Sequence, residues 1–269
     1  MKPVLFHLGS LPVHSFGVMM ALAFVVAGAV MQSDFARKSQ PRDLAWEIVG
    51  FGLVGGLLGA RLHQALYHWP LFASDPLAFM TSPSGLVWYG GVLGGVLATF
   101  WPIRKSHVPH ASARDTAALG LAVGLAIGRI GCHLSGDGDW GTPTELPWGV
   151  AYLNGTASWP HPPGVFVHPA ALYESAAQAI IFVLLLGLRR RALRVGSIFA
   201  VYILLSGLSR FAIEEIRTNQ PILLGLTEAQ WTSIALSAGA ALWLAWSTCW
   251  RARTAAGASA CWRPSPSRA

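Results

Sequence analysis

Long apolar stretches recur along most of the chain, and short polar segments separate them. A helix that crosses a membrane needs about 20 consecutive, mostly apolar residues. The pattern therefore predicts seven membrane-spanning helices, and these lie at 14–33, 47–67, 85–101, 115–134, 169–188, 195–216 and 229–250.

The composition supports this interpretation. Of the 269 residues, 53% are hydrophobic and only 12% are charged, and the mean hydropathy is +0.48. A soluble domain carries about 25% charged residues, and a disordered chain needs low hydrophobicity and high net charge. Three cysteines are an odd number and too few for a disulfide scaffold. We therefore expect an all-α integral membrane protein.

The positions of Lys and Arg predict the orientation of the helices. Most of the 19 Lys and Arg lie in 34–46, 102–114, 189–194 and 251–269, whereas the long segment 135–168 contains none. Cytoplasmic loops collect these residues, so we expect the N-terminus outside and the C-terminus in the cytoplasm. The net charge of +7 could instead indicate a nucleic-acid-binding surface. Because the charges are dispersed among helix ends, we expect no nucleic-acid partner.

The same pattern predicts the domain organisation. Residues 1–250 are expected to form a single seven-helix membrane domain, in which the loop around 135–168 is an extracytoplasmic cap. The loop 68–84 is also expected outside. Residues 251–269 are expected to be a disordered cytoplasmic tail. No cleavage site for a signal peptide follows Lys2 and the first apolar stretch, so we expect the first helix to be retained.

Several charged and polar residues lie within or beside the predicted spans at one depth. A charge inside a membrane is costly and usually faces a bundle interior or a water-filled cavity. Because these residues share the outer side of the membrane, we expect a polar cavity that opens to the outer leaflet. The residues concerned are Arg61, Tyr89, Arg129, His168, Tyr173, Glu174, Arg210, Glu214 and Arg217.

Structural explanations exist for the individual residues. Arg210, Glu214 and Arg217 follow an i, i+4, i+7 spacing that places them on one helix face, so Arg210 and Glu214 could be a structural pair. Arg61 could pair with a carboxylate such as Glu174 for packing, and Arg217 could extend to the interface. The clustering of the whole set favours a functional site.

The chemistry of this set favours an anionic ligand. The planar guanidinium fork of arginine suits phosphate and carboxylate, and an apolar surrounding at the outer leaflet suggests an anionic phospholipid headgroup. Gly90 and Gly91 follow Tyr89 and would let a ligand or another backbone approach closely. No group of ligands has metal-site spacing, so we expect no metal and no cofactor.

At these residues the sequence resembles the bacterial prolipoprotein diacylglyceryl transferases, over about residues 10–245. Six motifs stand in the family's order, and together they carry the resemblance. They are VHSFGVMM (13–20), GARL (59–62), WYGGVLGG (88–95), GRIGCHLSGDGDWG (128–141), HPAALYE (168–174) and SRFAIEEIR (209–217).

The resemblance implies an enzyme of the bacterial inner (plasma) membrane. Its substrates would be phosphatidylglycerol and the lipobox segment of a prolipoprotein, and it would act in the lipid bilayer, as a monomer. The diacylglyceryl group would pass to the lipobox cysteine thiol, and glycerol phosphate would leave. Arg129 and Arg210 would stabilise the leaving phosphate, Glu214 would orient Arg210, and Arg217 and Gly141 would complete the site.

The chain departs from the family at four places. Tyr89 stands where the family has His, Cys132 where it has Asn, and Ser206 where a Tyr is common. The segment SGDGDWG carries Asp137 and one residue more than the family's NGELWG. If the family's His is a base toward the thiol, a phenol is a poor replacement, because it ionises near pH 10 rather than 6.5.

Two further residues could compensate for these departures. His133 could supply an imidazole, although adjacent helix positions point about 100° apart. Cys132 is either a small packing residue or a nucleophile that forms a covalent intermediate.

Two other functions remain open from the sequence. One is a non-catalytic or differently specific paralogue that binds anionic phospholipid, and the departures at Tyr89 and Cys132 favour it. The other is a transporter for a small anion. A transporter should also carry polar residues toward the inner half or a broken-helix repeat, and the sequence shows neither.

Overall fold

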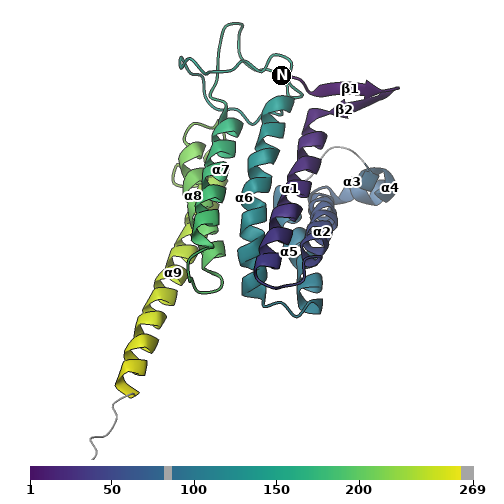
Figure 1. Ribbon diagram of the computed structural model, residues 1–269. Coiled ribbons are helices and arrows are strands. Elements are labelled where there is room, and N and C mark those ends of the chain that lie inside the picture. Colours follow the sequence, from purple (N-terminus) through teal and green to yellow (C-terminus); the bar gives the residue numbers. More distant parts are fainter. Residues whose placement is uncertain (82–86, 262–269) are drawn as a thin grey trace, which may run out of the picture. The chain divides into compact units, whose positions relative to one another are not determined.

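The computed structural model of this chain describes residues 1–81 and 87–261, and most of them are helical (Figure 1). Residues 85–86 of the third predicted helix and 262–269 of the predicted tail lie outside the described residues. Each predicted apolar stretch overlaps one long helix among the described residues. These helices are α1 (Ser15–Arg37), α2 (Leu44–Tyr67), α5 (Trp88–Lys105), α6 (His110–Ser135), α7 (Ala170–Leu188), α8 (Ser197–Glu214) and α9 (Glu228–Cys261).

Five of these helices, α1, α2, α6, α7 and α8, are long and apolar enough to cross a membrane. The spans predicted at 85–101 and 229–250 correspond to α5 and α9, which are not among the five, so the count of seven stays a prediction. The last helix also continues past the predicted end at residue 250 as far as Cys261. Residues 251–261 are therefore helical where a disordered tail was expected.

The sequence pattern missed four short elements. Two short helices, α3 (Trp69–Ser74) and α4 (Pro76–Thr81), lie in the predicted loop 68–84. An antiparallel hairpin of β1 (Val4–Leu8) and β2 (Leu11–His14) precedes α1, and helices make up most of the other described residues. Its turn contains Gly9, whose φ of +61° favours glycine.

The chain divides into two compact units. The single membrane domain predicted for residues 1–250 stays a prediction. The first unit is Met1–Met20 with Leu125–Ala269, and the second is Ala21–Gly124. Helices α1 and α6 contribute residues to both units.

Glycines bring α2 and α5 into close contact in the second unit. A Cβ added at Gly59 would collide with the carbonyl of Gly90 and lie 2.8 Å from the Cα of Gly94. A Cβ at Gly55 would collide with Ala98 in the same way. Small residues allow such backbone approach between membrane helices, where van der Waals packing drives association.

A buried ion-pair group joins α1 to α6 in the second unit. The Asp34 carboxylate is fully buried and pairs with Arg37 and Lys38, each at 2.8 Å. Thr116 on α6 donates to Asp34 at 2.8 Å, and the Lys38 ammonium donates to Thr116 at 2.7 Å. The buried negative charge of Asp34 is therefore compensated by two cations and a hydroxyl, and a structural role accounts for it. The sequence pattern had placed Asp34 in a loop.

The loop between α6 and α7 folds into a cap beyond the ends of these two helices (Figure 1). Trp140, Tyr152 and Val167 form a small buried core in it. Two backbone hydrogen bonds hold the start of the cap. Gly141 donates to the carbonyl of His168, at the end of the cap, at 2.8 Å, and Thr142 donates to the carbonyl of Ile216, in the turn after α8, at 2.7 Å. The cap is therefore fixed above the ends of three helices of the first unit.

Candidate active site

Three arginines and three carboxylates form one ion-pair network in the first unit. Four elements contribute: α6, α7, the end of α8 with its following turn, and the cap. The members are Arg129, Asp139, Glu174, Arg210, Glu214 and Arg217. Five of them were predicted from the sequence as site residues, and the structure brings these five together.

Glu174 lies at the centre of the network. Its Oε2 is 2.6 Å from Nε of Arg129, and its Oε1 is 3.0 Å from a terminal nitrogen of Arg210 and 3.4 Å from one of Arg217. The side chain is almost completely buried. A buried carboxylate needs such partners, because an unpaired charge is very costly there. Glu174 thus holds three guanidinium groups around one point.

Glu214 holds Arg210 from the second side. Its Oε2 is 2.7 Å from Arg210 one helical turn earlier. Its Oε1 accepts hydrogen bonds from Asn219 at 2.7 Å and Thr227 at 2.8 Å. Both oxygens of this fully buried side chain therefore have partners, which supports the predicted role of Glu214 in orienting Arg210. Sequence reasoning did not identify Asn219 and Thr227.

Asp139 enters the network from the cap. One carboxylate oxygen pairs with Arg129, and the other is 2.7 Å from Arg217. Burial raises the pKa of this carboxyl group, but the charges of Arg217 and Arg129 outweigh it, so the pKa lies below its ordinary value. Asp139 is consequently ionised at neutral pH.

Sequence reasoning missed Asp139 as a site residue, although a signal was present. The segment 135–168 carries acidic residues and no Lys or Arg, and it begins shortly after Arg129. An acidic loop beside several buried arginines favours a contact between them. With Asp139 the network contains three arginines and three carboxylates.

Gly141 explains how the cap reaches the network. A Cβ at this position would lie 2.6 Å from the carbonyl oxygen of Ile216 and 2.9 Å from the Cβ of His168. Only glycine allows the cap backbone to pass between these two segments, and an isolated bridge pairs Gly141 with Arg217. This packing positions Asp139, two residues earlier.

Arg210, Glu214 and Arg217 were predicted to lie on one helix face, and this is correct only for Arg210 and Glu214. Helix α8 ends at Glu214, so Arg210 and Glu214 share its face. Arg217 lies beyond the helix, in a turn where its own backbone N–H donates to the Glu214 carbonyl at 3.0 Å. The pairing of the turn with Gly141, rather than the helix, directs Arg217 toward Glu174.

His168 and Tyr173 lie where the cap joins α7. The Tyr173 hydroxyl is 3.2 Å from Nδ1 of His168 and accepts a 2.7 Å bond from the indole nitrogen of Trp148. These contacts fasten the cap to α7, next to Glu174 in sequence.

The remaining predicted site residues belong to the second unit. The Arg61 side chain is buried in α2 and donates to Gln64 at 3.1 Å. Tyr89 is 38% exposed at the start of α5. Gly90 is contacted by the backbone of Gly59, so another helix occupies the space that glycine provides there. A substrate-binding role of Arg61, Tyr89, Gly90 and Gly91 stays a prediction.

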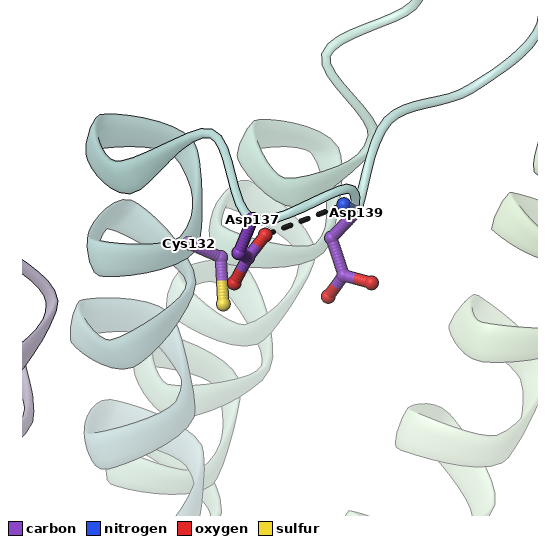
Figure 2. Close-up of side chains that lie close together, drawn as sticks. All are labelled: Cys132, Asp137 and Asp139. Atoms are coloured by element: carbon purple, nitrogen blue, oxygen red, sulfur yellow. Dashed lines mark hydrogen bonds between the residues drawn. The ribbon is translucent and has the colours of Figure 1, made fainter. Parts of the chain in front are cut away.

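Cys132, Asp137 and Asp139 lie close together at the end of α6 (Figure 2). Their potential ligand atoms lie within 4.8 Å of one another. Both carboxylate oxygens of Asp139 already pair with arginines, so the ion-pair network describes this arrangement better than a metal centre. The Cys132 sulfur accepts a 3.9 Å hydrogen bond from Arg129, and its role as a packing residue or a nucleophile stays a prediction.

His133 points to the cap core rather than to the network. Its Nδ1 is 2.9 Å from the hydroxyl of Tyr152, which is itself buried against Trp140. Burial raises the pKa of Tyr152 well above its ordinary value. A fixed structural contact therefore accounts for this imidazole.

A model of the family described as prolipoprotein diacylglyceryl transferase matches residues 3–246. The chain belongs to the prolipoprotein diacylglyceryl transferase family. Several relatives carry the name phosphatidylglycerol–prolipoprotein diacylglyceryl transferase. The one from Gloeobacter violaceus is 32% identical over 243 residues, which are 87% of this chain and 88% of the relative.

Two further relatives come from clostridia. The protein of Clostridioides difficile is 30% identical over 235 residues, covering 87% of this chain and 90% of its own. The protein of Clostridium tetani is 28% identical over 217 residues, covering 81% and 86%. As a member of this transferase family with several apolar helices, the chain is a multi-pass protein of the bacterial inner membrane.

Proposed function

We propose that this protein transfers the diacylglyceryl group of phosphatidylglycerol to the thiol of a lipobox cysteine in a prolipoprotein. The arginine network of Arg129, Arg210 and Arg217 is the observation that carries the proposal. It combines fixed guanidinium groups with the ends of apolar helices, as a site for the phosphate of a membrane lipid requires. The names of the relatives support the choice of lipid and acceptor.

The reaction determines what the protein must provide. A thioether forms when sulfur bonds to the glyceryl carbon, so the bond between that carbon and a phosphate oxygen must break. The thiol loses its proton, and glycerol phosphate leaves with the electron pair of the broken bond. Negative charge therefore grows on the phosphate as the reaction proceeds.

Arg129 and Arg210 are the groups proposed to stabilise this growing charge. Both are half-buried, and the buried carboxylates of Glu174 and Glu214 hold them in place, so little reorganisation of these contacts is needed when the charge appears. Glu214 and Glu174 act as positioning residues for the arginines. Tyr89 is proposed to donate a hydrogen bond to the lipid headgroup, since a phenol can do so without ionising.

We further propose a topology of seven spans with the network on the outer side. The distribution of Lys and Arg supports an external N-terminus and a cytoplasmic C-terminus. With this orientation the cap lies outside, and the network opens to the outer leaflet, where a secreted prolipoprotein would present its lipobox. A monomeric state stays a prediction.

Purified protein in phosphatidylglycerol vesicles, mixed with a synthetic lipobox peptide, tests the proposed function. We expect a peptide mass increased by one diacylglyceryl group, together with released glycerol phosphate. A peptide with serine in place of the lipobox cysteine should gain no mass. Vesicles of a zwitterionic lipid should support no transfer.

A protein that binds phosphatidylglycerol but yields no modified peptide would contradict the transferase function. That result would favour the non-catalytic paralogue. Arg42→Ala provides a matched control for purification, because Arg42 is an exposed residue of the second unit.

A further inference from the structure

Asp139 occupies positions on two arginines that a substrate phosphate would need. Its two carboxylate oxygens bridge Arg129 and Arg217, as two phosphate oxygens would. We propose that Asp139 is a built-in substitute for the phosphate, which holds these arginines in the free protein and leaves them when phosphatidylglycerol binds. This inference rests on the function proposed above.

The charge balance requires one carboxylate to leave. Three arginines and three carboxylates have no net charge, and a phosphodiester adds one negative charge. Binding without displacement would leave that charge uncompensated in an apolar surrounding, at a high cost. If one carboxylate moves into water as the phosphate enters, the network stays neutral.

The exposure of the side chains identifies the carboxylate that can leave. Asp139 is 30% exposed, whereas Glu174 is 8% and Glu214 is 0% exposed. Glu174 also binds all three arginines, and Glu214 has two further hydrogen-bond donors. Water can solvate only the Asp139 carboxylate without opening the helices.

One buried hydrogen-bond donor of the network has no acceptor among the described residues. The Nε–H of Arg217 has no hydrogen-bond acceptor among the described residues, and its side chain is only 9% exposed. The nearest carboxylate oxygen in its ion pairs, on Glu214, is 3.7 Å away. A phosphodiester offers more oxygens than a carboxylate, so it could accept from this donor in addition to those that Asp139 satisfies.

The cap backbone allows Asp139 to move. Gly138 precedes it with a φ of +101°, and a Cβ at Gly138 would make only ordinary contact, at 3.5 Å, with Ala157. The Asp139 amide donates a long bond of 3.3 Å to the exposed Asp137 side chain (Figure 2). By contrast, the shorter bond from Gly141 fixes the cap just after this segment. The segment before Gly141 can therefore turn while the rest of the cap stays in place.

The variant Asp139→Asn tests the proposal, because it keeps the shape and removes the competing charge. We expect the KM for phosphatidylglycerol in mixed micelles to fall by about tenfold, with no matching rise in kcat. Inhibition by glycerol phosphate, the soluble probe of the same positions, should strengthen by a similar factor. Asp137→Asn, two residues away and outside the ion-pair network, is the matched control and should change neither value.

A higher or unchanged KM in Asp139→Asn would overturn the proposal, since it would show that the carboxylate helps the substrate or does not compete with it. If wild-type protein transfers normally and this variant gains no affinity, only this inference fails. If wild-type protein neither transfers nor binds phosphatidylglycerol, the proposed function fails with it.

A second measurement uses wild-type protein and does not depend on folding of a variant. Hydrogen–deuterium exchange of the amides in 137–140 should become faster when glycerol phosphate is added, because Asp139 is released. Amides in the cap core should not change. Slower or unchanged exchange in 137–140 would contradict displacement.

Discussion

At the scale of single residues, the guanidinium fork of arginine allows one side chain to contact two carboxylates. Arg129 directs Nε to Glu174 and a terminal nitrogen to Asp139, so one side chain joins two carboxylates from different elements. Arg210 likewise contacts both Glu174 and Glu214. A lysine has one point charge and cannot reproduce these paired directions.

Replacement of Arg129 or Arg210 by Ala should reduce the rate of transfer at least about 100-fold, the usual effect of removing one donor that stabilises growing negative charge. Lys should restore little of the rate. The measurement is the peptide mass assay, with circular dichroism to verify folding and Arg42→Ala as the control. Full activity of both Ala variants would remove phosphate stabilisation from the account.

Tyr89 can be tested by removal of its hydroxyl alone. Tyr89→Phe should reduce transfer by about tenfold, equivalent to about 1.4 kcal/mol, if the phenol donates to the headgroup. Unchanged transfer would leave Tyr89 as an interfacial anchor. Tyr89→His is the informative companion: activity above that of wild type would show that the departure from the family weakens this protein.

At the scale of elements, close helix packing in the second unit depends on glycine. Gly59→Leu should lower the melting temperature in detergent, because its side chain would overlap the backbone of α5; overpacking typically costs about 1–3 kcal/mol. Gly50→Leu on the same helix is the matched control, since a Cβ there meets no atom within 4 Å. Equal melting temperatures of the two variants would contradict the close approach.

The elements also show what the sequence could predict. The lengths of the apolar stretches locate the long helices well, because every spanning helix must cross the same membrane thickness. Their ends are less certain: α6 begins at His110 rather than 115, since a helix can continue into polar sequence in water. The hairpin had a readable signal, the alternation of Phe6 and Leu8 before a Gly-containing turn, but a search for long apolar stretches does not detect it.

The candidate site was predictable only in part for a similar reason. The predicted orientation of the helices placed Arg129, Glu174 and Arg210 at the same depth in the membrane. The identity of each partner depends on long-range contacts, however, and Asp139 reaches the network only through backbone pairing of the cap. No periodicity in the sequence encodes that pairing.

At the scale of the whole molecule, the topology determines which side of the membrane the network faces. After replacement of Cys132, Cys249 and Cys261 by Ser, a cysteine at Ser158 in the cap should react with a membrane-impermeant thiol reagent in intact cells. A cysteine at Ser106, after α5, should react only after the membrane is permeabilised. The reverse pattern would overturn the predicted orientation.

Complementation of a bacterium depleted of its own transferase tests the central claim most directly, with the N-terminal cysteine of a lipoprotein read by mass spectrometry. The account predicts that wild-type protein restores growth and the diacylglyceryl mass, and that Arg210→Ala, expressed to the same level, restores neither. Restoration by Arg210→Ala, or an unmodified cysteine in cells that express the wild-type protein in the membrane, would contradict the account.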